Sequence, residues 1–330
     1  MTLEQVTLVS HADWSVSAKK RWIAIASLQA DGYWAVLDPI DKIDSTTLLA
    51  GLKSLGGETG CVLAGFDFPI GLPYHYALKA GVIDFLALLP QLGQNEWAQF
   101  YDPAKKPDQI NIHRPFYPQK PGGTNREQKI HGLGIPFEHL YRLCEVGHNN
   151  RRAACPLFWT LGGQQVGKAA ISGWKCMLSP AITDPTLKLR VWPFSGPLDE
   201  LCQPGNLIIA ETYPTEFYTH LGISFAKNRR LSKRKSSDRR DNAQSLLNWA
   251  ESLHLDLEKA VKHSIESGFG LTSNGDDRFD ALAGLFGMLN IVLGNHPLGE
   301  PTDPRIIDIE GWILGQDQLS KDIIDDRFNS

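Results

Sequence analysis

Five acidic residues interrupt or end apolar stretches of this 330-residue chain. They are Asp13, Asp67, Glu211, Asp277 and Asp280. A carboxylate at the edge of a core is costly unless it is paired with a cation or bound to a metal. Oxygen-only donors favour Mg²⁺ or Mn²⁺, and two such ions about 3.5–4 Å apart are typical of phosphodiester hydrolysis. The pattern therefore predicts a two-metal carboxylate site.

Spacing indicates how these acids would meet. Asp277 and Asp280 are three residues apart in DDRFDALAGL, so they share one face of a predicted helix whose apolar residues would pack on a sheet. Asp13 follows a strand-like stretch, and Asp67 stands inside the apolar run AGFDFPIGLP. If those two strands are neighbours, we expect all four carboxylates to lie at one edge of the sheet.

Each acid also has a structural interpretation. Asp13 and Glu211 are suited to capping, and Asp277 is favoured in a first helical turn by the helix dipole. Asp67 is the hardest to explain in this way, because Phe66 and Phe68 flank it. Taken together the acids favour a functional site, since perturbed carboxylates cluster there.

The elements that would position the acids form an α/β pattern. Periodicity and turn residues predict strands at Val6–Ala12, Arg21–Gln29, Tyr33–Leu37, Cys61–Phe68, Asn206–Ala210 and Gly311–Leu314, and helices at about Ser45–Leu55, Thr215–Leu221, Asn242–Leu253 and Asp276–Leu293. We expect the core to comprise residues 1–71 and 205–315, with an acidic tail at 316–330.

Residues 72–204 differ from the rest of the chain in composition and periodicity, and they predict a long insertion or subdomain. Prolines and glycines are dense there, and NIHRPFYPQKPGG has no stable periodicity. Helices are expected at Tyr74–Leu89 and Phe137–Val146, and a strand at Thr186–Val191. The mixture of Arg114, Phe116, Tyr117 and Lys120 resembles the basic and aromatic groups that bind single strands.

A basic segment predicts a nucleic-acid partner. Lys227–Arg240 holds eight Lys or Arg in fourteen residues. A run of this kind grips phosphates, although a solvated surface loop is the alternative interpretation. The expected nucleic-acid contacts are Arg229, Arg230, Lys233, Arg234, Lys235, Arg239 and Arg240.

Two other function classes have some support. Gly162–Ala169 (GGQQVGKA) nearly matches a phosphate-binding loop, which would make Lys168 part of an NTP-dependent enzyme, but Ala169 replaces the hydroxyl that would hold Mg²⁺. A non-catalytic nucleic-acid-binding or scaffold protein with the same fold is the second alternative. An actin-like ATPase is disfavoured, because no glycine precedes Gly32 to build its first hairpin.

Composition excludes several broad classes. With 42% apolar and 21% charged residues and a net charge of -4, the chain is neither disordered nor histone-like. Five cysteines without a C-x-x-C pair predict a reducing compartment. The longest apolar run, Ala281–Gly294, is too short to span a bilayer, and no secretory signal is apparent, so we expect a cytoplasmic protein with no membrane partner.

Several blocks resemble a widespread family of predicted ribonuclease-H-like nucleases. They are Asp13, DFPIGLP at 67–73, ETYP at 211–214, DRFDALAG at 277–284 and EGWI at 310–313. The fourth block also resembles the last-helix motif of the RuvC-type resolvases. The resemblance implies a mixed five-stranded sheet of order 3-2-1-4-5 with strand 2 antiparallel, and an insertion between strands 4 and 5.

The same resemblance implies the site residues. The metal ligands would be Asp13, Asp67 and Asp280, with Asp277 as a further ligand. Many ribonuclease H enzymes carry an essential acid on their first helix, and none stands out between Ser45 and Leu55. Asp67 or Glu211 would take that role.

Overall fold

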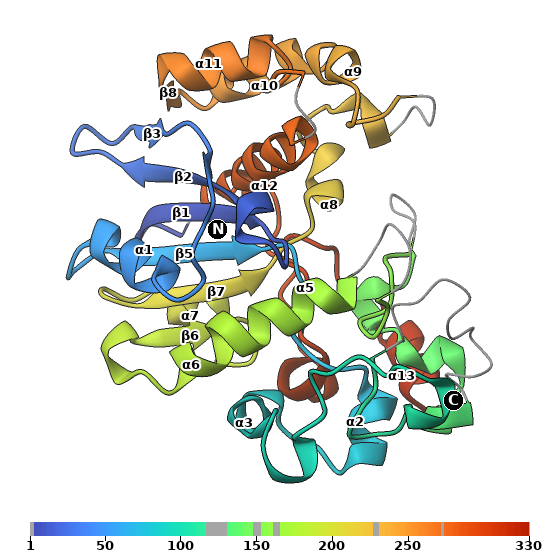
Figure 1. Cartoon of the computed structure of the whole chain (residues 1–330). Helices are drawn as coiled ribbons and strands as arrows, with labels where there is room; N and C mark the ends of the chain where they lie inside the picture. The colour runs from blue at the N-terminus through green and yellow to red at the C-terminus, as the bar shows by residue number, and fades with distance from the viewer. Residues whose placement is uncertain are drawn as a thin grey trace.

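The computed structural model describes residues 3–116, 131–147, 153–160, 166–226, 231–271 and 274–329. Eight strands in these residues form one mixed sheet of order β6-β7-β5-β1-β2-β3-β8, with β4 paired to β2 (Figure 1). β1 lies antiparallel to β2 and parallel to β5, which is parallel to β7. The strands are β1 Val6–Asp13, β2 Trp22–Leu28, β3 Trp34–Val36, β4 Ile40–Asp41, β5 Cys61–Phe66, β6 Leu189–Val191, β7 Leu207–Glu211 and β8 Asp256–Leu257.

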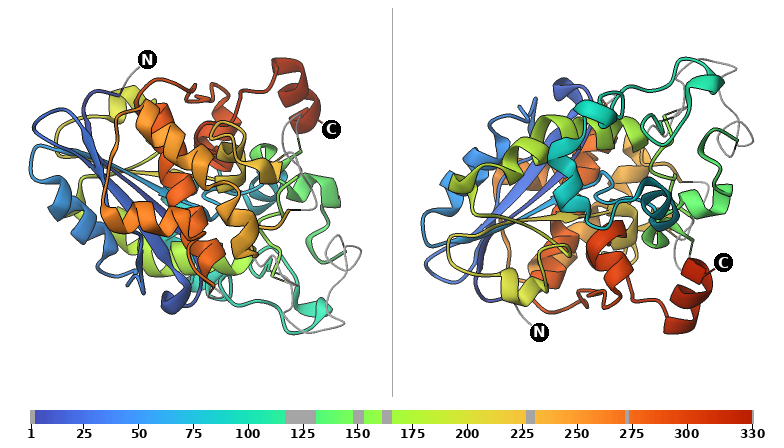
Figure 2. Two further views of the ribbon diagram at one scale, coloured as in Figure 1. Left: turned by 90° about the horizontal axis from the view of Figure 1, so that it is seen from above. Right: turned by 90° about the horizontal axis from the view of Figure 1, so that it is seen from below.

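Helices cover both faces of the sheet; in Figure 1, α12 passes behind β1 and β2, whereas α5 lies in front of the strands. Buried side chains of α10, α11 and α12 belong to one core, and those of α1, α3, α5 and α6 belong to the other. Orange helices lie nearest the viewer when the molecule is seen from above in Figure 2, and cyan and green segments do so from below. The helices are α1 Leu48–Gly56, α2 Tyr74–Ala80, α3 Phe85–Leu88, α5 Val166–Gly173, α6 Ser179–Ile182, α7 Leu198–Leu201, α8 Pro214–Tyr218, α9 Ser236–Arg240, α10 Ala243–Ser252, α11 Lys259–Glu266, α12 Gly275–Val292 and α13 Lys321–Asn329.

The central strands are buried on both sides because successive side chains point to opposite faces. Val9 and Leu63 belong to the core beneath α12, whereas Leu8 and Val62 belong to the core on the other face. This double burial explains the continuous apolar runs of β5 and β7.

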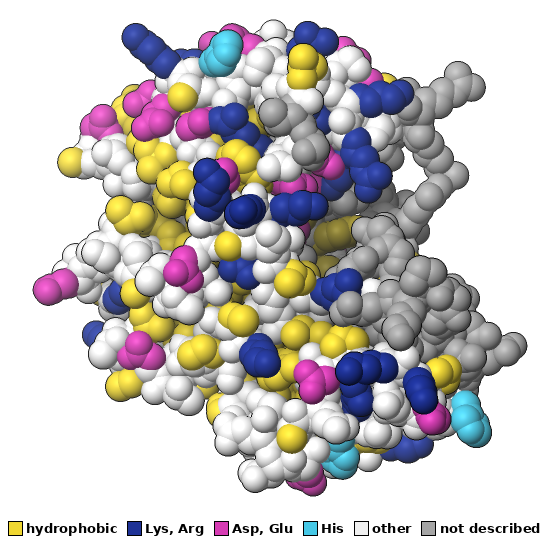
Figure 3. All heavy atoms as spheres, in the orientation of Figure 1, with side chains coloured by type: hydrophobic (Ala, Val, Ile, Leu, Met, Phe, Trp, Pro, Cys, Tyr) yellow, Lys and Arg dark blue, Asp and Glu magenta, His cyan; other side chains and the backbone are white. Residues whose placement is uncertain are grey.

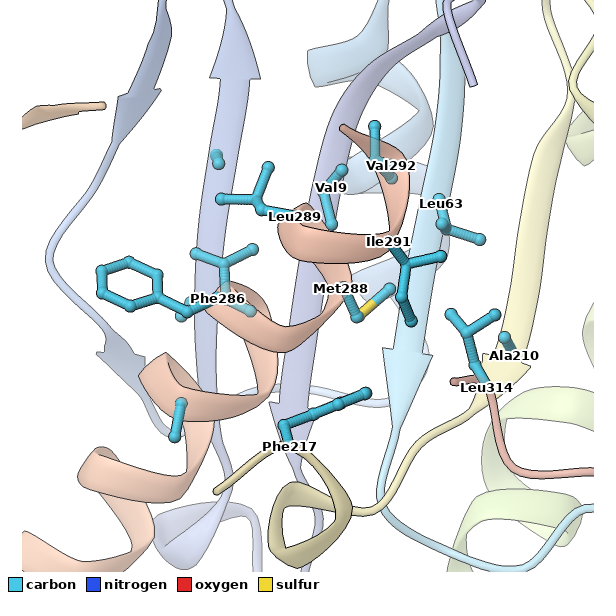
Figure 4. Packing of buried hydrophobic residues seen from close by; sticks show 14 of the residues in the cluster. Val9, Leu63, Ala210, Phe217, Phe286, Met288, Leu289, Ile291, Val292 and Leu314 are labelled. Atoms are coloured by element: carbon cyan, nitrogen blue, oxygen red, sulfur yellow. The ribbon is translucent and has the colours of Figure 1, made fainter. Parts of the chain in front are cut away.

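α12 is the helix that packs across the centre of the sheet. Figure 4 shows Met288 and Leu289 of this helix near Val9 of β1, with Phe217 of α8 alongside. Gly284 lies directly against the buried ring of His11, and burial lowers the pKa of that histidine to about 3, so the ring is neutral. No helix in the described ranges is long and apolar enough to cross a membrane.

The described part of residues 72–204 shares a core with the sheet. Phe85, Phe100 and Trp174 belong to the same apolar cluster as Phe66 and Phe68, which lie at the end of β5. The segment also contributes β6, which pairs with β7. The segment therefore covers part of the face of the sheet that lies opposite α12.

The expected elements need several corrections. The sheet has eight strands where five were expected: β4 and β8, of two residues each, were not expected, and β6 falls within the strand expected at Thr186–Val191 and joins the same sheet. The helix expected at Tyr74–Leu89 is broken, since Gly81 adopts a left-handed conformation (φ 70°) and Asp84 caps a new helix.

Two further expectations were wrong in detail. Phe137–Val146 forms two 3₁₀ turns, Phe137–Leu140 and Leu143–Glu145, in place of one helix. Gly311–Leu314 forms a single bridge between Ile313 and Glu211 in place of a strand. The expected acidic tail contains α13, whose Phe328 ring lies 4.9 Å from that of Tyr74.

Two glycine-to-alanine substitutions should change stability in opposite directions, because Gly284 lies in the contact between α12 and β1 and Gly51 has open space around it. A Cβ on Gly284 would lie 2.3 Å from the His11 ring, so Gly284→Ala should lower the free energy of unfolding by about 1–3 kcal/mol. A Cβ on Gly51 of α1 would meet nothing within 4 Å, so Gly51→Ala should raise it by about 0.5–1 kcal/mol. Urea denaturation of both variants checks this, and stabilisation by Gly284→Ala would contradict the packing.

Candidate active site

Four of the five predicted acids lie together near the carboxyl ends of β1 and β5. Asp13 is the last residue of β1, and Asp67 follows β5, its neighbour in the sheet. The Trp14 N–H donates to Asp67 Oδ1 at 2.6 Å, which holds that carboxylate beside the end of β1. Asp277 and Asp280 lie in the first turns of α12, which packs over β1.

Electrostatics show that these four carboxylates affect one another. Burial and the charges of Asp67, Asp280 and Asp277 raise the pKa of Asp13 well above its ordinary value. Burial, with Asp280, raises the pKa of Asp67 to about 7, although the Trp14 N–H opposes the shift. Burial raises the pKa of Asp277 to about 6, with contributions from its acidic neighbours. Negative charge is therefore crowded at this edge.

Lys233 supplies a positive charge to the cluster. Its ammonium donates to Asp280 Oδ2, and the Tyr218 hydroxyl donates to Asp280 Oδ1. Burial raises the pKa of the Tyr218 hydroxyl well above its usual range, so it is a neutral donor. Asp280 is thus held by two side chains from outside α12.

The donor set fits a hard divalent cation in its chemistry, because it consists of carboxylate oxygens whose mutual repulsion a cation would relieve. Within the described ranges, however, no three or more His, Cys, Asp or Glu side chains are arranged to hold a metal ion. The ammonium of Lys233 contacts Asp280 in this arrangement. The acids therefore fit such a cation in two respects: their oxygens are the type of donor that it prefers, and the acids lie at one edge of the sheet.

Glu211 is not a member of this cluster. Both of its oxygens accept from the Arg142 guanidinium at 2.7 Å, and Oε2 also accepts from the Ile70 N–H at 2.6 Å. Arg142 is completely buried and also bonds to Glu145 at 3.0 Å and to the Glu310 carbonyl at 3.1 Å. The expected role of Glu211 as a ligand or base therefore gives way to a structural role.

Arg142 is the buried charged residue beside the site that the sequence interpretation missed. It joins the ends of β5 and β7 to a turn of the 72–204 segment. The one signal in the sequence is a base inside an apolar stretch, EHLYRLCEV. A charged residue in such a stretch is rare unless it is paired.

The basic residues expected to contact nucleic acid differ in where the structure places them. Arg229 and Arg230 lie outside the described residues. Lys233 pairs with Asp280, and Arg234 lines a cavity beside Asp13 and Asp277.

The remaining basic residues lie around α9. Lys235 and Arg240 are exposed at its two ends. Arg239 is buried and donates to the carbonyl groups of Lys233, Gly268 and Gly270, so its expected phosphate contact was wrong. Its guanidinium satisfies backbone acceptors that would otherwise be unpaired.

Two cavities adjoin the acidic cluster. The larger, about 900 Å³, is lined by Asp67, Lys168 and Lys233 among others. The smaller, about 600 Å³, is lined by Asp13, Asp277 and Arg234 among others. Lys and Arg side chains gather around acidic side chains near the centre of the face seen in Figure 3. The cluster is therefore accessible to a small molecule or a chain.

The other expected nucleotide and single-strand contacts find little support. Residues 162–165 of the loop-like motif lie outside the described residues, although Lys168 in α5 lines the larger cavity. Tyr117 and Lys120 also lie outside them. Phe116 is part of the core, and Arg114 bonds to the carbonyl groups of residues 102 and 103, so neither forms a stacking platform.

Comparisons with family models, curated proteins and solved structures give no match for this chain. The functional argument therefore depends on the geometry and chemistry of the site.

The raised pKa values predict how stability depends on pH without added metal. An aspartate ionises near pH 3.8 in the unfolded chain, and Asp67 ionises near 7 in the folded protein. Between these values the folded state binds more protons, so the free energy of unfolding should fall as pH rises. We expect Asp67→Asn, which keeps an acceptor for the Trp14 N–H, to flatten this dependence by at least about 1 kcal/mol between about pH 5 and 8.

Denaturant unfolding at several pH values, with a chelator present, measures this difference. Parallel profiles for the wild type and Asp67→Asn would show that Asp67 carries no raised pKa. Glu310, whose pKa burial raises to about 7, contributes equally to both proteins and is removed by the comparison.

The ion pair at Asp280 predicts that Lys233→Met destabilises the protein by about 1–3 kcal/mol, because a buried carboxylate loses a charged donor. Lys235→Met is the matched control, since Lys235 is exposed, and should change stability by less than about 0.5 kcal/mol. A double-mutant cycle with Asp280→Asn isolates the pair. Additive effects in that cycle would rule out the interaction.

Proposed function

We propose that this protein is a nuclease that hydrolyses phosphodiester bonds with two Mg²⁺ or Mn²⁺ ions. The observation that carries the proposal is the meeting of four carboxylates, from β1, the end of β5 and α12, at one edge of the sheet. Their raised pKa values indicate a site that needs positive charge. Lys and Arg side chains around the acids suit a phosphate-bearing substrate.

We also propose that the fold is ribonuclease-H-like. The successive neighbours β3, β2, β1, β5 and β7 support this assignment, because they give the order 3-2-1-4-5 when β4, β6 and β8 are left aside. The antiparallel pairing of β2 with β1 supports it too. In such an arrangement the carboxyl ends of parallel strands bring side chains to a common edge.

The four acids divide the work of the proposed reaction. Asp13, Asp67 and Asp280 would hold the ions, and Asp277 would serve as a fourth ligand or orient the attacking water. Bound there, the ions supply Lewis acidity and charge neutralisation. Lys233 would exchange its contact with Asp280 for a phosphate oxygen of the substrate. Arg142 and Glu211 would keep the ends of β5 and β7 in place.

One observation favours a second candidate, a nucleic-acid-binding protein that does not cleave. The Lys233 ammonium already neutralises part of the acidic cluster, and no metal-holding group is preformed in the described ranges. Such a protein would bind nucleic acid in a salt-dependent way without turnover.

The nuclease proposal predicts Mn²⁺-dependent cleavage of nucleic acid that Asp13→Asn and Asp280→Asn each reduce at least about 100-fold, because each removes a charged oxygen donor. Labelled single-stranded, duplex and hybrid substrates measure the activity, and calorimetry with Mn²⁺ alone measures binding. The control is Glu251→Gln, an exposed acid on α10, which should retain full activity.

The outcomes separate the two candidates. Binding of nucleic acid without cleavage of any substrate, in the presence of Mn²⁺, would favour the binding protein. Cleavage that survives both Asp substitutions would place the chemistry elsewhere in the chain.

A further inference from the structure

The acidic cluster lines two hollows that share part of their walls. Asp67 faces the larger hollow, and Asp13 and Asp277 face the smaller one. Both are lined by Trp14, Ser15 and Lys20, which follow β1 directly or lie in the turn Ala18–Lys20. Three of the acids therefore line one or the other of two neighbouring hollows.

The wall shared by the two hollows is closely packed around Trp14. The Trp14 ring is 6% exposed and lies 5.6 Å from the rings of Phe66 and Phe68. The Arg21 guanidinium covers it at 4.2 Å from the ring centroid. Since Trp14 is held in this way, a chain that passes from one hollow to the other must cross it without displacing it.

Each hollow carries positive side chains. Lys168 of α5 and Lys233 line the larger hollow, Arg234, the residue after Lys233, lines the smaller one, and Lys20 lines both. Positive groups in both hollows beside the acids match a ligand that carries more than one phosphate. Both volumes fall within the roughly 300–1,000 Å³ of cavities that enclose drug-sized ligands, which is ample for a nucleotide unit.

We infer that a nucleic-acid strand lies across both hollows and that the bond cleaved is internal, so that the protein is an endonuclease. Lys168 and Arg234 are the outer phosphate contacts, one in each hollow. An enzyme that removes terminal nucleotides needs to bind the strand over a long stretch on only one side of the bond that it cleaves. The inference rests on the proposed nuclease function and adds the position of the bond.

Circular substrates test this inference, because a circle has no end. Circular single-stranded DNA, circular RNA and a closed duplex plasmid are incubated with Mn²⁺, each beside its linear counterpart. We expect a circle to be opened at a rate within about threefold of its linear form, since both cross the same two hollows. Cleavage of linear substrates alone would overturn the inference and leave the nuclease proposal standing. No cleavage of either form would overturn both.

Two variants test the outer contacts. Lys168→Ala and Arg234→Ala should each raise the substrate concentration for half-maximal cleavage of the circle about fivefold, with kcat changed less than about twofold, because each removes ground-state binding. Each should also reduce the slope of log affinity against log salt by about one. The matched control is Lys105→Ala, an exposed lysine of the 72–204 segment.

Circular dichroism and the urea midpoint show whether the variants are folded. A Lys168→Ala protein that behaves like Lys105→Ala in both affinity and salt slope would remove Lys168 from the substrate path. If Arg234→Ala also behaves like the control, the strand does not cross both hollows.

Discussion

Repulsion among buried carboxylates is the constraint on which this site depends. Asp13, Asp67, Asp277 and Asp280 come from three elements, and burial together with their mutual charge raises the pKa of three of them. Lys233 provides the compensating charge in the structure. Because this lysine lies in the segment before α9, the same charge also ties that segment to the edge of the sheet.

A second charge network stands beside the first and has a different purpose. Arg142 bonds to Glu211, Glu145 and two backbone carbonyl groups while it is completely buried. Removing one partner of such a network leaves a buried charge without compensation, which is strongly destabilising. The network therefore anchors the 72–204 segment to the ends of β5 and β7. Lys168 of α5 and Arg142 line the same cavity.

Packing of the apolar core also fixes the positions of the acids. α12 approaches β1 closely because Gly284 leaves room for the His11 ring, and this approach brings Asp280 toward Asp13. On the other face, Phe66 and Phe68 fix Trp14, whose N–H orients Asp67. Packing on both faces of the sheet thus determines where the charged groups lie.

The sequence alone determined the main strands, α12 and the acids at their ends, because periodicity and turn residues are local properties. That Asp13 and Asp67 lie at the ends of neighbouring strands was a condition in the sequence argument, and the pairing of β1 with β5 in the structure fulfils it. Only the tertiary structure decided the partners of Glu211 and Asp280, since Arg142 is 69 residues from the first and Lys233 is 47 residues from the second. It also decided that Arg239 is buried. Side-chain pairing at such separations depends on how the elements pack, and no local pattern records it.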